Sequence, residues 1–242
     1  MKITPIKTRI INPPRDNIYK IIDQFCPKLV KGDVLVITSK IISIHQGRCL
    51  PVDSVKSKDK LIKRQADLFI SRKKSPGQHV ILTLKNNTLI PSAGIDQSNA
   101  RGHYILWPEK PYQQAKKICQ YLRKKFHTPK IAVIITDSHS TPLRYGVLGI
   151  SIGFFGLYPL KDYRGEKDIF KKPLKSSQAN IIDALAAAAT LVIGESDQKT
   201  PMALIQGAKF LRFTNKTNKN DLLVPPKKDI FYPLLKTFFK KP

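Results

Sequence analysis

The chain has 242 residues, enough to bury a full hydrophobic core in one large domain or two small lobes. Its 43 Lys and Arg against 17 Asp and Glu give a net charge of +26, which attracts polyanions such as nucleic acid, anionic lipid headgroups and phosphorylated small molecules. The three cysteines lie far apart, which excludes a zinc ribbon and a disulfide framework. With no apolar signal region at the N-terminus, we expect a reduced, cytoplasmic protein.

The first expected strand carries polar residues at its end. Apolar residues at helical spacing predict a helix over 17–29, and the β-branched run at 34–37 predicts a strand buried on both faces. Two hydroxyls, one of them on Ser39, and then Lys40 follow this strand. A lysine at such a position can hold a phosphate as a point charge, but it is equally typical of a solvated loop.

The next part of the chain mixes expected helices with a hairpin. Residues 53–69 predict a very basic helix, and the apolar runs on either side of residues 85–87 predict a β-hairpin. A small, polar segment over 92–99 follows, with Asp96 as its one acid. Residues 112–126 predict a helix with one apolar and one strongly basic face.

The central strand is expected at residues 131–135, five apolar and mostly β-branched residues typical of a strand buried on both faces. It delivers Asp137 and Ser138 at its carboxyl end, where open sheets commonly place ligands. Carboxylate and hydroxyl oxygens suit a hard cation such as Mg²⁺ or Mn²⁺. A strand that simply ends in a polar turn explains the same residues.

The second half of the chain predicts one more helix and two more strands. A serine at 176 or 177 is expected to cap a helix that runs through residue 189. A third buried strand is expected at 191–193, ending in Gly194 and Glu195, and a fourth at 202–205.

Three acids therefore fall at expected strand or loop ends, namely Asp96, Asp137 and Glu195. Carboxylates that converge repel one another unless a cation neutralises them, so their convergence would indicate a metal site. Standard nucleotide motifs are absent from the sequence: it contains neither GxxxxGK[ST] nor GxGxxG. The GxSxG and HExxH motifs of hydrolases are also absent.

Taken together, these segments resemble the coenzyme F420-0:L-glutamate (γ-glutamyl) ligases. The resemblance covers about residues 5–215 and leaves a basic C-terminal extension over 216–242. It implies a single catalytic unit over 1–242, with an α+β fold of mixed β-sheets and flanking helices in two lobes, and a homodimer. The matching segments, in family order, are residues 32–40, 92–99, 134–138, 161–165 with Asp168, 183–189 with Gly194 and Glu195, and 201–207.

The resemblance also implies a chemistry, in which GTP and two divalent cations, Mg²⁺ or Mn²⁺, activate an acceptor carboxylate as an acyl phosphate that L-glutamate then attacks. The metal positions carry over to Asp96, Asp137, Ser138 and Glu195, with Ser138 in place of the usual threonine. The nucleotide positions carry over to Ser39, Lys40, Asn99 and the segment 193–200, which includes Ile193, Gly194 and Gln198. Lys40 and Arg164 are the candidates for neutralising phosphate or carboxylate charge, although Arg164 would equally pair with Asp162 or Glu166.

The chain departs from the family pattern at two places near the expected site. Ile44 stands where a lysine is usual, and residues 140–144 replace a Gly-Arg-Pro-Trp-Arg-like stretch but keep Arg144. The resemblance favours an F420-type acceptor, with a folate-type acceptor as the close alternative. A basic nucleic-acid-binding protein would explain the charge but not the ordered acids, and a catalytically silent scaffold is the other alternative.

Overall fold

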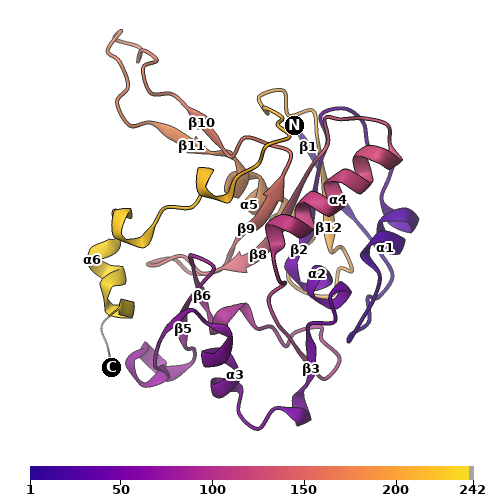
Figure 1. The fold of residues 1–242 in the computed structure, drawn as a ribbon, viewed down its shortest axis with the longest axis vertical. Helices are drawn as coiled ribbons and strands as arrows, with labels where there is room; N and C mark the ends of the chain where they lie inside the picture. Colours follow the sequence, from indigo (N-terminus) through magenta and orange to yellow (C-terminus); the bar gives the residue numbers. More distant parts are fainter. Residues whose placement is uncertain (240–242) are drawn as a thin grey trace.

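A five-stranded mixed sheet forms the centre of the computed structural model, which describes residues 1–239 (Figure 1). Its only parallel pair is β2 with β8, and the other neighbours are antiparallel. This arrangement confirms the α+β class with mixed sheets. In spatial order the strands are β1 (Lys2–Ile6), β12 (Met202–Gln206), β2 (Val34–Thr38), β8 (Ala132–His139) and β9 (Leu148–Phe155).

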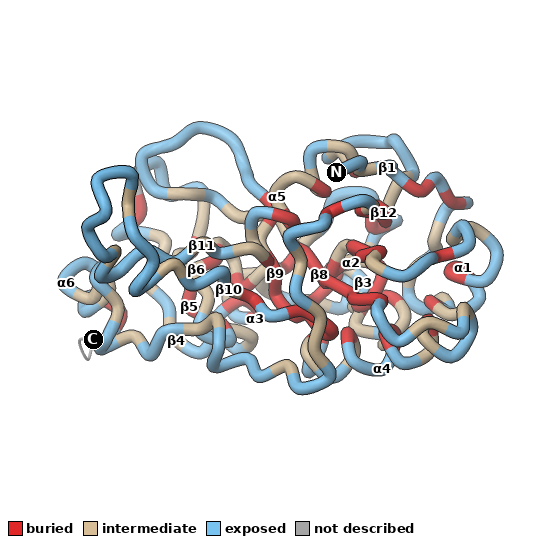
Figure 2. Tube along the Cα trace, turned by 90° about the horizontal axis from the view of Figure 1, so that it is seen from above, coloured by how far each residue is buried: buried red, intermediate tan, exposed pale blue. Residues whose placement is uncertain are grey.

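Helices cover both faces of this sheet. Helices α1 (Ile18–Phe25), α2 (Ser39–His45) and α4 (Pro111–Lys125) pack on one face, and α5 (Ile181–Ile193) packs on the other. Alternate residues of β2 and β8 therefore enter two different cores, which is why their apolar runs are continuous. In Figure 2 the buried residues are concentrated along β8 and β9.

A smaller lobe has its own hydrophobic cluster, built around Leu61, Ile62 and Ile81. The predicted hairpin is present in it, and its turn residues Asn86 and Asn87 have φ of 49° and 60°, as a type I′ turn requires. The elements of this lobe are α3 (Lys58–Gln65), the antiparallel sheet β4 (Leu68–Ile70), β5 (Leu82–Lys85) and β6 (Thr88–Pro91), and the pair β3 (Cys49–Pro51) and β7 (His103–Ile105).

Two further segments extend from the body. The hairpin of β10 (Leu160–Asp162) and β11 (Gln178–Asn180) carries a long loop that projects away from the sheet (Figure 1). The C-terminal segment passes through the short helix η5 (Lys219–Asp221) and α6 (Tyr232–Leu235), and its end packs against β4 of the smaller lobe. Within residues 1–239, no helix has the length and apolar character needed to span a bilayer.

Two predicted elements are wrong. The helix expected over 53–69 is confined to α3, and β4 follows it. The strand expected at 191–193 is the last turn of α5, where Leu191 is 81% exposed. A three-residue apolar run does not distinguish a strand from a helix end. Asn180, and not the expected serine, caps α5 by accepting the Asp183 N–H.

Candidate functional site

Lys40 and Asp96 form an ion pair where the sheet meets the smaller lobe. Strand β2 ends at Thr38 and α2 begins at Ser39, so Lys40 lies in the first turn of a helix and not in a solvated loop, the alternative that the sequence left open. Its Nζ lies 2.6 Å from the Asp96 carboxylate and donates to the Ser98 carbonyl at 2.9 Å. Burial raises the pKa of Asp96, but the Lys40 ammonium and the Ser98 donors outweigh burial and hold it below its usual value.

Asp137 lies on β8 with its carboxylate between two donors. One oxygen accepts from the Trp107 indole N–H, and the other accepts from the Ser138 backbone N–H at 3.0 Å. Burial nevertheless raises the pKa of Asp137 to about 6, with a smaller contribution from the negative charge of Asp96. The two carboxylates are therefore close enough to repel each other. The Ser39 hydroxyl acts in the opposite direction and lowers the same pKa.

Sequence reasoning missed Trp107, the single tryptophan of the chain. It lies beside Gly94, whose φ of +69° and missing side chain leave room for the indole ring. A Cβ at Gly94 would collide with that ring. The only available signal was a lone tryptophan between the two expected acidic segments, which does not by itself indicate a carboxylate partner.

The segment after α5 brings Glu195 to the same strand. Ser138 Oγ donates to Glu195 at 2.7 Å. Asp137 and the residue that contacts Glu195 are therefore neighbours on β8. Asn99 Nδ2 donates to the Ser196 carbonyl at 2.8 Å and joins the Asp96 segment to this one. Together with the Lys40–Asp96 pair, these contacts connect four separate parts of the sequence, namely residues 40, 96–99, 138 and 195–196.

The nucleotide candidates Ile193, Gly194 and Gln198 form the turn that carries Glu195. Gly194 ends α5 with φ of 78°, and a Cβ there would lie 2.7 Å from the Gln198 side chain. Gln198 accepts the Ser196 N–H at 2.9 Å, and the Ile193 carbonyl accepts from Thr200. Internal hydrogen bonds therefore fix the shape of this turn.

Among the oxygen donors predicted as metal ligands, the side chains of Ser138 and Glu195 contact each other directly, and Asp137 adjoins Ser138 on β8. Among residues 1–239, no three His, Cys, Asp or Glu side chains converge closely enough to hold a metal ion. Lys40 neutralises Asp96, and Trp107 donates to Asp137. A set of carboxylates and one hydroxyl fits Mg²⁺ or Mn²⁺, since Mg²⁺ is usually bound through one or two carboxylates and keeps several waters.

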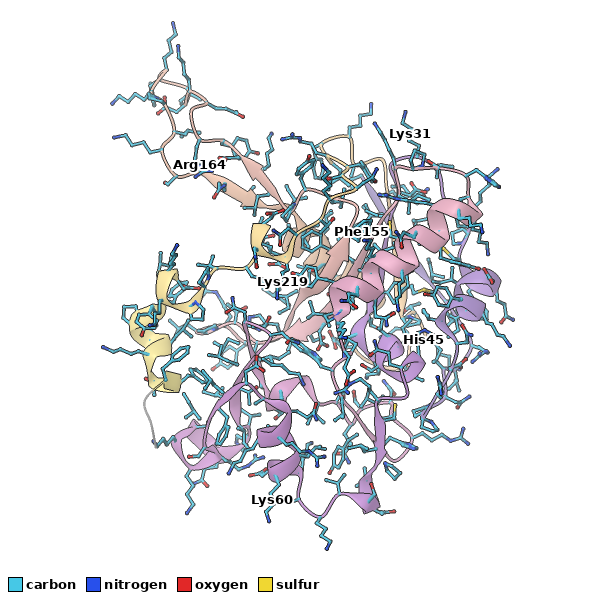
Figure 3. All side chains as sticks on the ribbon, in the orientation of Figure 1. Lys31, His45, Lys60, Phe155, Arg164 and Lys219 are labelled. Atoms are coloured by element: carbon cyan, nitrogen blue, oxygen red, sulfur yellow. The ribbon has the colours of Figure 1, made fainter. Side chains whose placement is uncertain are left out.

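Arg164 does not belong to this cluster within one chain. It lies on the projecting hairpin, next to β10 (Figure 3). Its guanidinium is 2.6 Å from Asp162, and both side chains are exposed. The structure therefore shows the ion pair with Asp162 that the sequence had left as an alternative.

The two departures from the family pattern occupy different surroundings. Ile44 is only 2% exposed and packs with Cys49, Ala100 and Ile105, a core position that would bury a lysine charge. Residues 140–144 follow β8 as a largely exposed loop, where Arg144 donates to the neighbouring Leu143 carbonyl.

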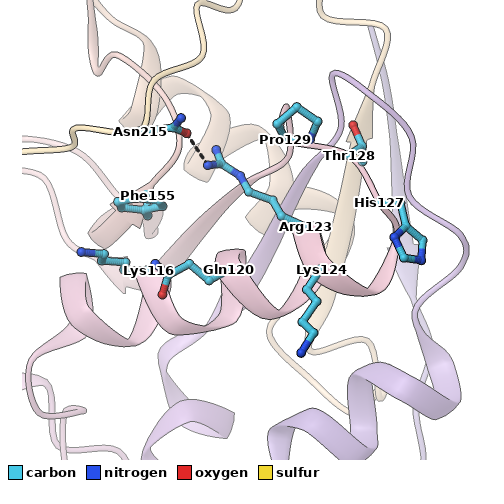
Figure 4. Close-up of a pocket in the computed structure, with 9 residues that line it drawn as sticks. All are labelled: Lys116, Gln120, Arg123, Lys124, His127, Thr128, Pro129, Phe155 and Asn215. Atoms are coloured by element: carbon cyan, nitrogen blue, oxygen red, sulfur yellow. Dashed lines mark hydrogen bonds between the residues drawn. The ribbon is translucent and has the colours of Figure 1, made fainter.

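A separate, basic pocket of about 570 Å³ lies along the second half of α4 (Figure 4). Lys116, Arg123 and Lys124 line it, but none of the predicted site residues does. Arg123 donates to the Ile131 carbonyl and to Asn215, so it ties α4 to the start of β8 and to the C-terminal segment. This pocket contributes basic residues to the surface. It does not include the acidic cluster, by which we mean Asp96, Asp137 and Glu195.

Comparison with known proteins identifies the relatives of the chain. A "Coenzyme F420:L-glutamate ligase" of Methanopyrus kandleri is 30% identical, with 96% of this chain and 97% of the relative covered. A protein with the same description from Methanocaldococcus jannaschii is 31% identical, with 89% and 90% covered. One from Methanococcus maripaludis is 36% identical over 63% of this chain and 60% of its own length.

The family model "F420-0:Gamma-glutamyl ligase" matches residues 5–207, a span that includes every residue of the acidic cluster. It also includes Trp107 and the turn after α5. The chain belongs to the F420-0:gamma-glutamyl ligase family.

Proposed function

We propose that this protein is a GTP- and divalent-metal-dependent ligase that joins L-glutamate through an amide bond to the carboxylate of an F420-type acceptor. The observation that carries the proposal is the contact network of Lys40–Asp96, Asp137 and Ser138–Glu195 in a chain of this family. The relatives are coenzyme F420:L-glutamate ligases by name, which favours the F420-type acceptor.

Asp96, Asp137, Ser138 and Glu195 would hold the metal. A bound divalent cation would neutralise triphosphate oxygens and stabilise the charge that develops during phosphoryl transfer. Burial, with a smaller contribution from the charge of Asp96, raises the pKa of Asp137, and a bound cation would offset both effects. The Ser138 hydroxyl holds Glu195 against the same strand, so the donors are preorganised from two sides.

The nucleotide would lie between Lys40 and the turn 193–200. Lys40 offers an ammonium near Ser39, and it would exchange part of its contact with Asp96 for a phosphate oxygen. The rigid turn built by Gly194 and Gln198 offers backbone groups, and Asn99 is hydrogen bonded to it. This placement brings phosphates next to the proposed metal ligands.

The reaction has two balanced steps. An acceptor carboxylate oxygen attacks the γ-phosphorus of GTP, the bond to the β-phosphate oxygen breaks, and GDP leaves. The α-amine of glutamate then attacks the acyl phosphate carbon, inorganic phosphate leaves, and the nitrogen loses a proton as the amide forms. Lys40 stabilises negative charge in the first step.

We also propose a homodimer, formed through the projecting hairpin. Ile169 and Phe170 on this loop are 89% and 77% exposed, which is unusual for adjacent large apolar side chains. Arg164 on the same loop would reach a reaction centre only in a partner chain. Sedimentation velocity of the wild type and of Phe170→Asp tests the assembly, and a monomeric wild type would contradict it.

The ligase assay incubates the protein with GTP, Mn²⁺, L-glutamate and either F420-0 or a folate. Mass spectrometry then detects one added glutamyl unit, and GDP and phosphate are measured in parallel. Addition to F420-0 supports the proposal, and addition to the folate alone would move the chain to the second acceptor with the same chemistry. GTP binding with no addition to either acceptor would refute both assignments.

A further inference from the structure

A cavity of about 670 Å³ lies beside the acidic cluster and has no role in the chemistry described above. Trp107 forms part of its wall, and the indole N–H of the same residue donates to Asp137. One side chain therefore separates the cavity from the proposed reaction centre. The volume suits a drug-sized organic ligand.

The cavity contains a buried hydroxyl without a partner. Ser151 on β9 is 7% exposed, and its Oγ has no hydrogen-bond partner among the described residues. Its backbone N–H is already used, since it donates to Asp183 at 2.9 Å. An unsatisfied buried hydroxyl destabilises a fold. The Oγ atom is itself buried, so it would reach a ligand in the cavity after the Ser151 side chain changes its rotamer.

The C-terminal segment closes one side of this cavity. Lys219 and Leu223 line it, and Asn87 donates to the Val224 carbonyl at 2.7 Å, which pins the segment to the β5–β6 turn. Lys219 lies between the sheet and the C-terminal helices (Figure 3). These residues lie beyond the span 5–207 that the family model matches.

The residues that line the cavity combine apolar side chains with side-chain amides and two lysines. Trp107, Tyr112 and Leu223 supply apolar surface, while Asn87 and other amides supply donors and acceptors. Two lysines, Lys110 and Lys219, are the charged residues among the described lining residues, and no acid is among them. This composition fits a flat heterocycle with amide-like edges that carries an anionic substituent.

We propose that this cavity binds the ring-bearing end of the acceptor, and that the C-terminal segment selects the acceptor through Lys219. This inference rests on the proposed ligase function. It places the planar, nitrogen-containing ring of that acceptor in this cavity and its phosphate or carboxylate substituent near Lys219. Ser151 hydrogen bonds to a polar atom of the ring, and Lys219 neutralises the anionic substituent.

The test uses Trp107 as the only tryptophan reporter in the full-length protein. Flavin mononucleotide and folic acid are titrated against intrinsic fluorescence, with riboflavin as the ring without phosphate and inorganic phosphate as the anion without ring. Energy transfer from Trp107 also quenches fluorescence when a ring binds elsewhere on the protein. The binding position of the ring is therefore determined with variants. These are Lys219→Glu, Ser151→Ala and the control Lys227→Glu, an exposed lysine of the same segment that does not line the cavity. GTP binding is measured separately by calorimetry.

We expect at least one ring probe to bind, and Lys219→Glu to weaken it by about tenfold while Lys227→Glu leaves it unchanged. Ser151→Ala should weaken the same probe without destabilising the free protein, because it removes an unpaired hydroxyl. Equal binding by all three variants would overturn the cavity assignment, as would GTP binding without binding of any ring probe. Ring binding of the expected pattern without GTP binding would support the cavity and refute the ligase function.

Discussion

Replacing Asp137 with asparagine should stabilise the metal-free protein at neutral pH. The fold raises the pKa of this carboxyl from its usual 3.8 to about 6, so the folded state binds the proton more tightly than the unfolded chain. Below about pH 3.8 both states are protonated and this stability is fully present. It is lost as the pH rises to about 6, because ionisation is then unfavourable in the fold.

The magnitude follows from the size of the shift. A shift of about two pKa units corresponds to about 3 kcal/mol of stability lost by pH 7. Asparagine avoids this loss, but its single side-chain oxygen cannot accept from both Trp107 and Ser138, which costs about 1 kcal/mol. The variant should therefore be about 1 kcal/mol less stable than the wild type at pH 4 and about 2 kcal/mol more stable at pH 7.

Urea unfolding of both proteins in EDTA, at pH 4 and pH 7, measures this difference. Asp53→Asn, on an exposed short helix, is the control and should show little change between the two pH values. Mg²⁺ should then stabilise the wild type more than Asp137→Asn, because the variant lacks one of the three proposed carboxylate ligands. A stability difference that stays the same at both pH values would refute the assigned burial of the Asp137 charge.

Three further predictions concern neighbouring contacts. Lys40→Met removes the ammonium from Asp96. It should lower the rate of GTP-dependent glutamate addition in the mass-spectrometric assay by about 100-fold and should also reduce GTP affinity. An unchanged rate would exclude Lys40 from the reaction. Trp107→Phe removes the indole donor and should raise the pKa of Asp137 further. The acid limb of the pH–rate profile should then move to higher pH. An acid limb that does not move would contradict the Trp107–Asp137 contact. Asn180→Ala removes the cap of α5 and should cost about 1 kcal/mol in thermal or urea unfolding, with no change in GTP affinity if the cap is purely structural.

The sequence identified the elements whose patterns are long. Continuous apolar runs predicted β2 and β8 as strands buried on both faces, and helical spacing predicted α4 almost to the residue. Short patterns were unreliable: the run at 191–193 completes α5, and the basic stretch over 53–69 breaks into a helix and a strand. The packing of α5 on the sheet, and not local preference, decides the first case.

The sequence by itself placed acids and hydroxyls near the ends of expected elements, and its family resemblance selected Asp96, Asp137, Ser138 and Glu195. Only the tertiary structure shows which of these groups meet, because residues far apart in the chain contact each other through the order of strands in the sheet. The segment between β7 and α4 brings Trp107 to Asp137, a pairing that no local pattern encodes. Arg164 lies on a projecting loop, because β10 and β11 form a separate two-stranded sheet that is not part of the central one.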